Sequence, residues 1–413
     1  MSDIKVSVII PVYGTREWLP YCLDSVLGQT LSDIEVICVD DASTDGCAGI
    51  LEEYAARDER VRIITMAKNS GQGICRNAGL DAARGEYVYL LDSDDMISSG
   101  ALEKLCRIAD EDDLDGVLFN MTAIYESEEI KRTITEKPGE SGTGYPEGVV
   151  RGEELFNIYM DNGEWVCYVQ KQLWRRDFID RERIRFTPRH EHEDEVFAFE
   201  ALVSAERVRY IPDKLFIRRW RRGSVMTTPP GPANFYGYFK GLLELMEFCD
   251  ERGLASRQID RNNARMYEKM TRLYPVLSEE YDLSELISPE DMPVYRLFTA
   301  AQKAYLHFGD IPDEVIDKAR AAKHVFIYGA GVKGTQAFES LVRAGLAIDA
   351  FLVTDPKDAG KAVKGRPVIA IEEADIPEGS LILVAAGEGY RREIERTLDE
   401  IGYEYIFYRG SKR

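Results

Sequence analysis

Three aspartates follow a short apolar segment, and carboxylates in that position can bind a metal ion. The segment runs from Tyr87 to Leu91, and Asp92, Asp94 and Asp95 come directly after it. Carboxylates this close repel one another at neutral pH unless water or a divalent cation screens them, and hard oxygen ligands suit Mg²⁺ or Mn²⁺. The alternative is a solvated turn whose aspartates cap a helix. We interpret the cluster as a metal site for a phosphorylated ligand.

The elements that must position these carboxylates alternate along the first part of the chain. Continuous β-branched runs bounded by polar turns predict buried strands, and amphipathic stretches between them predict helices. This alternation predicts an α/β fold with a parallel, doubly wound sheet and ligands at the carboxyl ends of its strands. The expected strands are 6–12, 34–39, 61–66 and 87–91, and the expected helices are 16–29, 46–57, 72–83 and 100–111.

Polar side chains follow two further strands of this sheet. Tyr13 to Thr15 come after the first strand, and Asp40 to Gly46 come after the second. The segment 69–77 places two glycines at a helix start and Arg76 one turn later, so that backbone amides and a cation could face an anion. Each feature alone also fits an N-cap or a surface ion pair. Together at one sheet edge they favour a site for a base, a ribose and a diphosphate.

These segments closely resemble the family-2 glycosyltransferases of the GT-A fold, a nucleotide-diphospho-sugar transferase fold. The resemblance is colinear over about the first hundred residues. It implies an inverting, metal-dependent enzyme whose donor is a nucleotide sugar, most often a UDP-sugar. The matching segments are 6–13 (VSVIIPVY), 22–30 (CLDSVLGQT), 39–46 (VDDASTDG), 76–80 (RNAGL), 83–87 (ARGEY) and 91–95 (LDSDD), with Asn69 and Gly71.

The resemblance also implies roles for residues at the predicted sheet edge. Pro11 and Tyr13 would flank the nucleoside, Asp41 would contact the base or ribose, and Arg76 would lie near the nucleotide. Asp92 and Asp94 match the D-x-D motif of the family, and Asp95 holds the third acidic place. We predict that Asp94 and Asp95 bind Mg²⁺ or Mn²⁺, with Asp92 on the nucleotide side, and which of the three binds the metal directly is left open.

A general base is implied by the segment Glu193-Asp194-Glu195-Val196-Phe197, which fits the acidic motif of the family. The reaction requires one carboxylate that takes the proton of the acceptor hydroxyl while its oxygen attacks the sugar C1. We predict that Asp194 is this base, and the alternative is an acidic helix start. His190 and His192 could bind a transition metal, but we favour acceptor contact or exposure for both.

The segment Phe216 to Ser224 is similar to a second motif of the family, in which two arginines precede Gly-Ser. Arg219 and Arg221 occupy the matched positions and would neutralise the diphosphate. A basic edge strand is the alternative. These arginines and the run 171–176 form cationic and aromatic patches that could meet an anionic lipid surface or a lipid diphosphate acceptor. A purely structural role is equally open.

A second glycine-rich motif lies near the C-terminus, after helical patterns over 236–253, 256–277 and 292–308. Gly329, Gly331 and Gly334 follow a predicted strand and open a helix, and Asp355 ends the next strand, as in a dinucleotide fingerprint. The segment resembles the small Rossmann-like domains appended to bacterial surface-polysaccharide enzymes. It could bind a nucleotide, a nucleotide sugar or a dinucleotide, or serve in packing and assembly.

The composition indicates which classes of binding partner and which cellular location to expect. With 52 basic and 73 acidic residues, the net charge of -21 argues against nucleic acid. The seven cysteines show no C-x-x-C spacing, which argues against a zinc ribbon or a disulfide framework. Neither a membrane span nor a signal peptide is apparent. We expect a cytoplasmic protein, with peripheral contact at the inner face of the membrane and homo-oligomerisation left open.

The predicted organisation is a GT-A domain (1–228), a helical connector (229–320) and a small Rossmann-like α/β domain (321–413). The predicted function is metal-dependent transfer of a sugar from a UDP-sugar or related donor to a hydroxyl of a glycan or lipid-linked acceptor, in bacterial surface or capsular glycan synthesis. The alternative is a catalytically silent protein that binds nucleotide sugars or serves in assembly.

Overall fold

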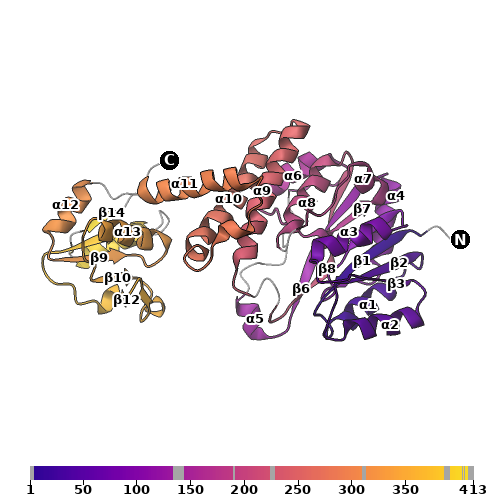
Figure 1. Ribbon diagram of the computed structural model, residues 1–413, viewed down its shortest axis with the longest axis horizontal. Helices are drawn as coiled ribbons and strands as arrows, with labels where there is room; N and C mark the ends of the chain where they lie inside the picture. Colours follow the sequence, from indigo (N-terminus) through magenta and orange to yellow (C-terminus); the bar gives the residue numbers. More distant parts are fainter. Residues whose placement is uncertain are drawn as a thin grey trace. The chain divides into compact units, whose positions relative to one another are not determined.

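The protein folds into two compact units, Met1–Leu286 and Ile287–Arg413 (Figure 1). The computed structural model describes residues 4–133, 144–188, 191–223, 228–308, 313–385, 391–401, 403 and 405–407. The predicted connector, 229–320, is divided between the units. Its first two helices, α9 (Pro232–Arg252) and α10 (Arg257–Leu277), belong to the first unit, whereas α11 (Met292–Phe308) and α12 (Asp313–Ala321) belong to the second.

The first unit is built on one mixed sheet, which confirms the predicted α/β fold. Its strand order is β3-β2-β1-β4-β7-β6-β8-β5. The first four of these strands are parallel, and β7 runs antiparallel to both β4 and β6. The strands are β1 (Val6–Val12), β2 (Ile34–Asp40), β3 (Val61–Thr65), β4 (Tyr87–Leu90), β5 (Met96–Ile97), β6 (Gly116–Tyr125), β7 (Gln172–Arg175) and β8 (Val208–Trp220).

Helices cover both faces of the parallel part of the sheet, as the strand and helix alternation predicted. Alternate residues of β1 lie in a core shared with α1 (Leu19–Leu27), α2 (Cys47–Arg57) and α4 (Ala101–Glu111). On the opposite face, α3 (Gln72–Ala82) packs so closely that a Cβ on Gly79 would lie 2.3 Å from Cγ2 of Ile9. Glycine is therefore required there for helix and strand to meet.

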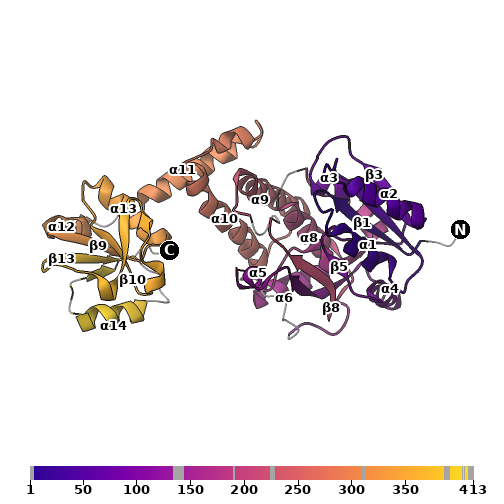
Figure 2. The same ribbon diagram turned by 90° about the horizontal axis from the view of Figure 1, so that it is seen from below.

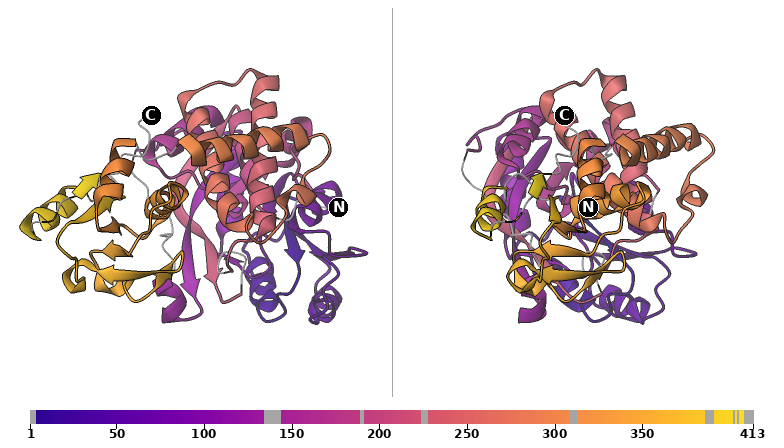
Figure 3. Two further views of the ribbon diagram at one scale, coloured as in Figure 1. Left: turned by 60° about the vertical axis from the view of Figure 1, so that its left-hand side comes forward. Right: turned by 90° about the vertical axis from the view of Figure 1, so that its left-hand side faces the viewer.

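Helix α8 (Glu193–Ser204), which carries the predicted base, belongs to a group of packed helices in the first unit. Helix α8 packs against α6 (Gly152–Asn162) and α9, and α10 packs against α6 and α9 (Figure 3). Helix α10 begins at Ser256, whose Oγ accepts a hydrogen bond from the backbone N–H of Ile259 at 3.2 Å. The first unit also contains α5 (Glu128–Thr133), α7 (Arg176–Arg181) and the short 3₁₀ turns η1 (Val169–Lys171) and η3 (Leu283–Leu286).

The second unit contains a smaller sheet with helices on both faces (Figure 2). Its strand order is β11-β12-β10-β9-β13-β14, and every pairing except that of β11 is parallel. Helices α12 and α13 (Val332–Arg343) pack on one face, and α14 (Arg391–Ile401) packs on the other. The strands are β9 (His324–Tyr328), β10 (Ala350–Val353), β11 (Ala362–Val363), β12 (Arg366–Ala370), β13 (Ser380–Val384) and β14 (Tyr405–Phe407), with 3₁₀ turns η4 (Pro356–Asp358) and η5 (Ile371–Glu373). This order is consistent with the predicted doubly wound unit.

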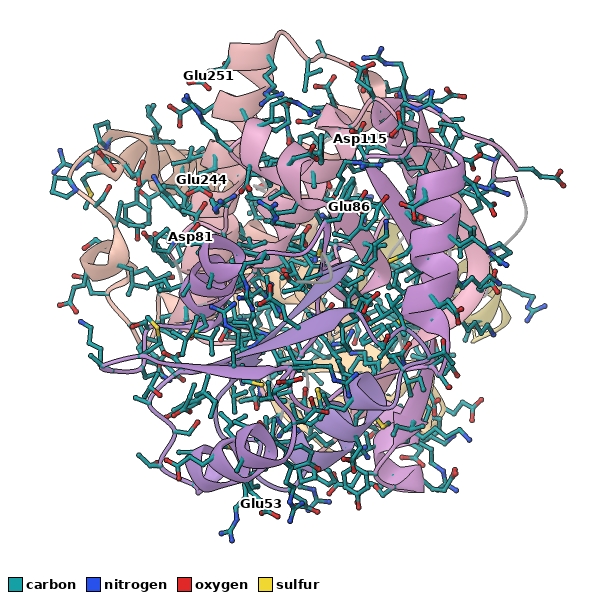
Figure 4. All side chains as sticks on the ribbon, turned by 90° about the vertical axis from the view of Figure 1, so that its right-hand side faces the viewer. Glu53, Asp81, Glu86, Asp115, Glu244 and Glu251 are labelled. Atoms are coloured by element: carbon teal, nitrogen blue, oxygen red, sulfur yellow. The ribbon has the colours of Figure 1, made fainter. Side chains whose placement is uncertain are left out.

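The acidic composition is visible on the surface of the first unit. Figure 4 labels acidic residues from several elements of the first unit, among them Glu53 of α2, Asp81 of α3 and Glu244 of α9, so negative charge is spread over its surface. Two of the labelled acids form ion pairs with arginines: Glu86 with Arg175 at 3.1 Å and Asp115 with Arg181 at 3.8 Å. Within the described ranges, no helix combines the length and the apolar character that crossing a bilayer requires.

Candidate active site

The carboxyl ends of β1, β2 and β4 lie at one edge of the first sheet and bring the predicted residues together. Pro11 lies inside β1, buried and paired with Val39 of β2. Tyr13 follows the strand, and its side chain is 53% exposed. Thr15 donates a hydrogen bond to Oγ of Ser93 at 2.9 Å, which joins the end of β1 to the end of β4.

Asp41, at the end of β2, organises the loop that leads into α3. Its two carboxylate oxygens accept hydrogen bonds from the backbone amides of Ser70 (2.7 Å) and Gly71 (2.9 Å). Gly71 has φ of 90°, a conformation that favours glycine. Asp41 is buried, so its carboxylate shapes this loop directly. Its predicted contact with a base or ribose stays a prediction.

Asp92 is the most heavily bonded of the three aspartates after β4. Its Oδ1 accepts hydrogen bonds from Gln72 at 2.5 Å and from Arg76 at 2.7 Å, and its Oδ2 accepts one from Gln170 at 2.6 Å. These donors come from α3 and η1, so Asp92 ties two elements to the end of β4. The arrangement distinguishes Asp92 from its neighbours Asp94 and Asp95.

Asp94 and Asp95 contact the end of β8. Oδ2 of Asp94 accepts a hydrogen bond from Nε of Arg221 at 2.7 Å, and the Asp94 carbonyl accepts one from Nε of Arg219 at 3.1 Å. Oδ1 of Asp95 accepts from the backbone N–H of Arg219 at 2.7 Å. Burial and the charge of Asp92 raise the pKa of Asp94, while Arg221 opposes them. Burial, Asp94 and Asp92 raise the pKa of Asp95 well above its ordinary value.

We call the region of Asp92, Asp94, Asp95, Arg219 and Arg221 the donor corner. The carboxylates of this corner fit a metal ion that is also bound by the substrate. Within the part of the chain that the structure describes, no group of three or more His, Cys, Asp or Glu side chains could hold a metal ion. Mg²⁺ usually takes one or two carboxylates and completes its octahedron with substrate phosphates and water. Asp94 and Asp95, two carboxylates whose charges disfavour each other, match that requirement without a complete protein cage.

The predicted diphosphate arginines lie at this corner among aromatic rings. The guanidinium of Arg219 lies 4.9 Å from the ring of Trp18 and 5.3 Å from the ring of Tyr21. Tyr21 is 57% exposed. Arg219 and Arg221 both contact Asp94, so they are held beside the predicted metal ligands. Ser224, the end of the matched motif, lies outside the described residues.

Arg76 is buried between two carboxylates and is only 2% exposed. Its Nη2 donates to Asp92 at 2.7 Å, and its Nη1 donates to Oε1 of Glu193 at 2.8 Å. Its guanidinium also lies 5.1 Å from the ring centre of Phe186. Arg76 thus joins the end of β4 to the first turn of α8. Its predicted position near the nucleotide stays a prediction.

Asp194 is the member of the acidic triplet at the start of α8 that keeps a free carboxylate. We find no hydrogen-bond partner for its side chain among the described residues. Burial raises the pKa of Asp194 to about 7, the charges of Glu193 and Glu195 act in the same direction, and Arg76 opposes them. A carboxylate with this pKa can accept a proton near neutral pH and is ionised often enough to do so.

Glu195 has the opposite environment. Its carboxylate forms an ion pair with Arg265 of α10, at 2.9 Å for the Nη1–Oε1 contact, and Nζ of Lys269 lies 3.4 Å from Oε1. Burial disfavours its charge, but Arg265 and Lys269 hold the pKa of Glu195 at about 2. Glu195 therefore fastens α8 to α10 and is not available as a base.

His192 precedes α8 in a left-handed backbone conformation, with φ of 61°. Its ring stacks on Tyr238 of α9 at 3.8 Å, and its Nε2 lies 3.4 Å from Nδ2 of Asn234. These contacts attach the turn before Asp194 to α9. The predicted contact of His192 with an acceptor stays a prediction, and His190 lies outside the described residues.

Several residues of the site were not predicted from the sequence. Gln72 and Gln170 bind Asp92, and Arg265 and Lys269 neutralise Glu195. The only signal available for Glu193 was its place beside Asp194. The glutamines and the α10 cations carry no motif, because their roles depend on contacts between distant parts of the chain.

In the second unit, the glycine motif has a packing role. Gly331 precedes α13, and a Cβ on Gly334 would lie 1.7 Å from the carbonyl oxygen of Gly329. Asp355 follows β10, is exposed, and accepts a hydrogen bond from the backbone N–H of Lys357 at 2.9 Å. Close backbone packing accounts for Gly334, and ligand binding at this motif stays a prediction.

Comparison with known proteins identifies the family. The family model described as "Glycosyl transferase family 2" matches residues 7–178. An uncharacterized glycosyltransferase of Bacillus subtilis, EpsJ, is 34% identical over 256 residues, which cover 60% of this chain and 71% of the relative. The poly(ribitol-phosphate) beta-glucosyltransferase of Bacillus spizizenii is 30% identical over 256 residues, covering 60% of this chain and 37% of the relative.

The fold also matches a solved structure. TarS residues 1–349 of S. aureus, crystallised with UDP-GlcNAc, align with a TM-score of 0.50 over 88% of this chain and 98% of that chain, at 20% identity. This likeness supports the predicted GT-A fold. From the family match and the extent of the shared sequence with EpsJ, we conclude that the chain belongs to the family-2 glycosyltransferases.

Proposed function

We propose that this glycosyltransferase transfers a sugar, with inversion at C1, from a nucleoside-diphosphate sugar to a hydroxyl group of its acceptor. The observation that carries the proposal is the environment of Asp194. Among the three acids at the start of α8, Glu193 is paired with Arg76 and Glu195 with Arg265, whereas Asp194 has a free carboxylate whose pKa burial raises to about 7. That environment suits a general base.

In the proposed reaction, Asp194 takes the proton of the acceptor hydroxyl while the acceptor oxygen forms a bond to the sugar C1. The bond between C1 and the diphosphate oxygen breaks on the opposite side, and its electron pair leaves with the nucleoside diphosphate. The products are the glycosylated acceptor, the nucleoside diphosphate and a protonated Asp194. Loss of that proton to water restores the base.

The leaving diphosphate needs positive charge around it. Asp94 and Asp95 would hold Mg²⁺ or Mn²⁺, which when bound neutralises the charge that develops on the diphosphate. Arg219 and Arg221 lie at the same corner and can add charge to it. Pro11 and Tyr13 at the end of β1 would contact the nucleoside, and Asp41 would shape its pocket through the loop at Gly71.

The name of one relative bears on the acceptor. By its name, the poly(ribitol-phosphate) beta-glucosyltransferase transfers glucose to a ribitol-phosphate polymer, and the chain shares 256 aligned residues with it. We therefore propose a UDP-sugar as donor and a glycan or lipid-linked acceptor in bacterial surface or capsular glycan synthesis. The enzyme would work in the cytoplasm or at the inner face of the membrane, and the second unit would bind a nucleotide or serve in assembly.

One observation favours the catalytically silent alternative. Nε of Arg221 lies 2.7 Å from Oδ2 of Asp94, so a cation of the protein already occupies a predicted metal ligand. A protein locked in this state could bind a nucleotide sugar without transferring it. In an active enzyme, Arg221 would exchange Asp94 for the diphosphate when the donor binds.

A nucleotide-release assay distinguishes the two functions. Release is measured with a panel of UDP-, GDP- and dTDP-sugars, with Mn²⁺ or Mg²⁺, with and without EDTA, for the wild type and for Asp94→Asn. Metal-dependent release from one donor that is lost in the variant would support the transferase. Saturable UDP binding without release from any donor would support the silent alternative.

A further inference from the structure

A buried arginine connects the two halves of the first unit's site. Arg76 of α3 donates to Asp92, sixteen positions later in the chain, and to Glu193, which is 117 positions away. Asp92 belongs to the corner where the donor is expected, and Glu193 directly precedes the proposed base Asp194 on α8. One guanidinium therefore contacts both the donor corner and the helix that carries the base.

The packing around Arg76 extends this connection. The guanidinium lies over Phe186, and the Phe186 ring stacks on Phe197 of α8 at 4.1 Å. The next residue of α3, Asn77, donates to the carbonyl of Phe186 at 2.6 Å and accepts from its backbone N–H at 2.9 Å. Helix α3 is therefore joined to the start of α8 directly by an ion pair and indirectly through Phe186, which contacts Arg76 and stacks on Phe197.

A glycine of α3 shows how close this approach is. A Cβ on Gly73 would lie 3.0 Å from Cγ of Glu193. Glu193 is buried, with 6% of its surface exposed. The ion pair with Arg76 therefore stabilises this close approach, because a buried carboxylate without a cationic partner is strongly disfavoured.

The charges that face Asp194 give Arg76 a second role. Glu193 and Glu195 on α8 and Asp92 after β4 raise the pKa of Asp194, and Cys167 also lies near enough to interact with it. Arg76 is the cation that opposes them. Arg265 and Lys269 form ion pairs with Glu195.

We propose that Arg76 is a positioning residue for sugar transfer: it holds Asp92 and Glu193 together and thereby fixes Asp194 toward the donor side of the site. This inference rests on the proposed function, because it assigns a role to Arg76 in the same reaction. It predicts that the two partners of the ion pair, Arg76 and Glu193, have opposite effects on the pH dependence of transfer.

Three variants and one control test it by the pH dependence of kcat/KM. The acid limb is the part of the profile in which kcat/KM falls as the pH drops and the base becomes protonated. Arg76→Gln removes the cation, so this limb moves to higher pH. For a displacement of one pH unit, kcat/KM measured on the limb is about tenfold lower than in the wild type at the same pH. Glu193→Gln removes a negative charge beside Asp194, so the limb moves to lower pH. Arg76→Lys keeps the charge but loses the two-pronged contact, so the limb stays near the wild-type pH while kcat falls.

Arg151→Gln is the matched control, because Arg151 forms an ion pair with Glu206 at 2.8 Å on the surface. It should leave both kcat and the limb unchanged. Thermal unfolding and UDP binding are measured for each variant. If Arg76→Gln fails to fold, the other two variants decide the question, because the limb should move to lower pH in Glu193→Gln and stay in place, with a lower kcat, in Arg76→Lys.

Two results would overturn the inference. One is a limb that stays at the wild-type pH in both Arg76→Gln and Glu193→Gln while the rates fall, which is the behaviour of a purely structural ion pair. The other is a limb that moves in the same direction in both. If the wild-type enzyme transfers sugar and the variants give either result, only the role of Arg76 is contradicted. Absence of wild-type turnover with every donor and acceptor contradicts the proposed function, and the role of Arg76 with it.

Discussion

Glu195 provides the most quantitative prediction for the first unit. Its carboxylate is 2% exposed and paired with Arg265 and Lys269, which hold its pKa at about 2 instead of its ordinary value of 4.5. A pKa lower by roughly 2.5 in the folded state corresponds to about 3 kcal/mol of stability. Glu195→Gln should therefore lower the free energy of unfolding by about 3 kcal/mol at pH 7, and by more if the two cations left without a partner add a penalty.

The pH dependence of this loss follows from the direction in which folding moves the pKa. Because the folded state lowers the pKa of Glu195, the stabilisation is fully present above the unfolded value of 4.5 and is lost as the pH falls toward 2. At pH 3 the contribution should be about 1.5 kcal/mol, roughly half of that at pH 7. The difference between wild type and Glu195→Gln should shrink accordingly.

Urea unfolding followed by tryptophan fluorescence at pH 7 and pH 3 measures both values. Trp165 is a suitable reporter, because it packs on Phe156 of α6 at 5.1 Å between ring centres. Glu206→Gln is the control, since its ion pair with Arg151 is exposed on both sides and should contribute about 0–1 kcal/mol. A loss below about 1 kcal/mol for Glu195→Gln at pH 7 would refute the claim that this pair fastens α8 to α10.

Three further predictions concern the site and the second unit. Asp194→Asn should reduce transfer by about 10²–10⁴-fold while UDP binding is retained, and the wild-type kcat/KM should fall as the pH drops through about 7, because protonation of Asp194 removes the base; a flat profile from about pH 5 to pH 8 would contradict this role. Asp94→Asn should abolish the Mn²⁺- or Mg²⁺-dependent part of nucleotide release, and release that is equally sensitive to EDTA in the variant would exclude Asp94 as a ligand. Gly334→Ala should unfold the second unit in a thermal melt, because its Cβ would lie 1.7 Å from the Gly329 carbonyl oxygen, whereas Gly331→Ala should be tolerated because nothing lies within 4 Å of that Cβ; equal melting of both variants would refute the packing argument.

The sequence predicted the parallel strands and the edge where their polar ends meet. Continuous β-branched runs and the polar residues after Val12, Val39 and Leu91 are local signals, and local signals determine which elements form and where they end. The family resemblance added the roles proposed for Asp94 and Asp194. In the structure, Asp94 lies in the turn after β4 and Asp194 lies in the first turn of α8, and their roles stay predictions.

What the sequence could not predict is how the charges are distributed within each cluster. Asp92, Asp94 and Asp95 look equivalent in the sequence, yet Asp92 is bonded to Gln72, Arg76 and Gln170. These partners lie up to 78 positions from Asp92 in the sequence, so only the folded chain brings them together. In the same way, no local pattern shows which carboxylate of 193–195 remains free, because the cations that neutralise its neighbours come from α3 and α10.

The division of the chain also depended on tertiary packing. Amphipathic patterns predicted the helices of 229–320 without showing which core they join. Helix α9 packs against α8, and α10 packs against α6, so these two helices support the proposed base. Their role in the first unit follows from contacts such as that of Tyr238 with His192.

The anomeric configuration of the product tests the central claim most directly. Proton NMR of the glycoside formed from a donor with an α-linked sugar should show a β linkage, because Asp194 is proposed to activate the acceptor oxygen for attack on the face opposite the leaving diphosphate. A product that retains the α configuration would contradict an inverting mechanism with Asp194 as its general base.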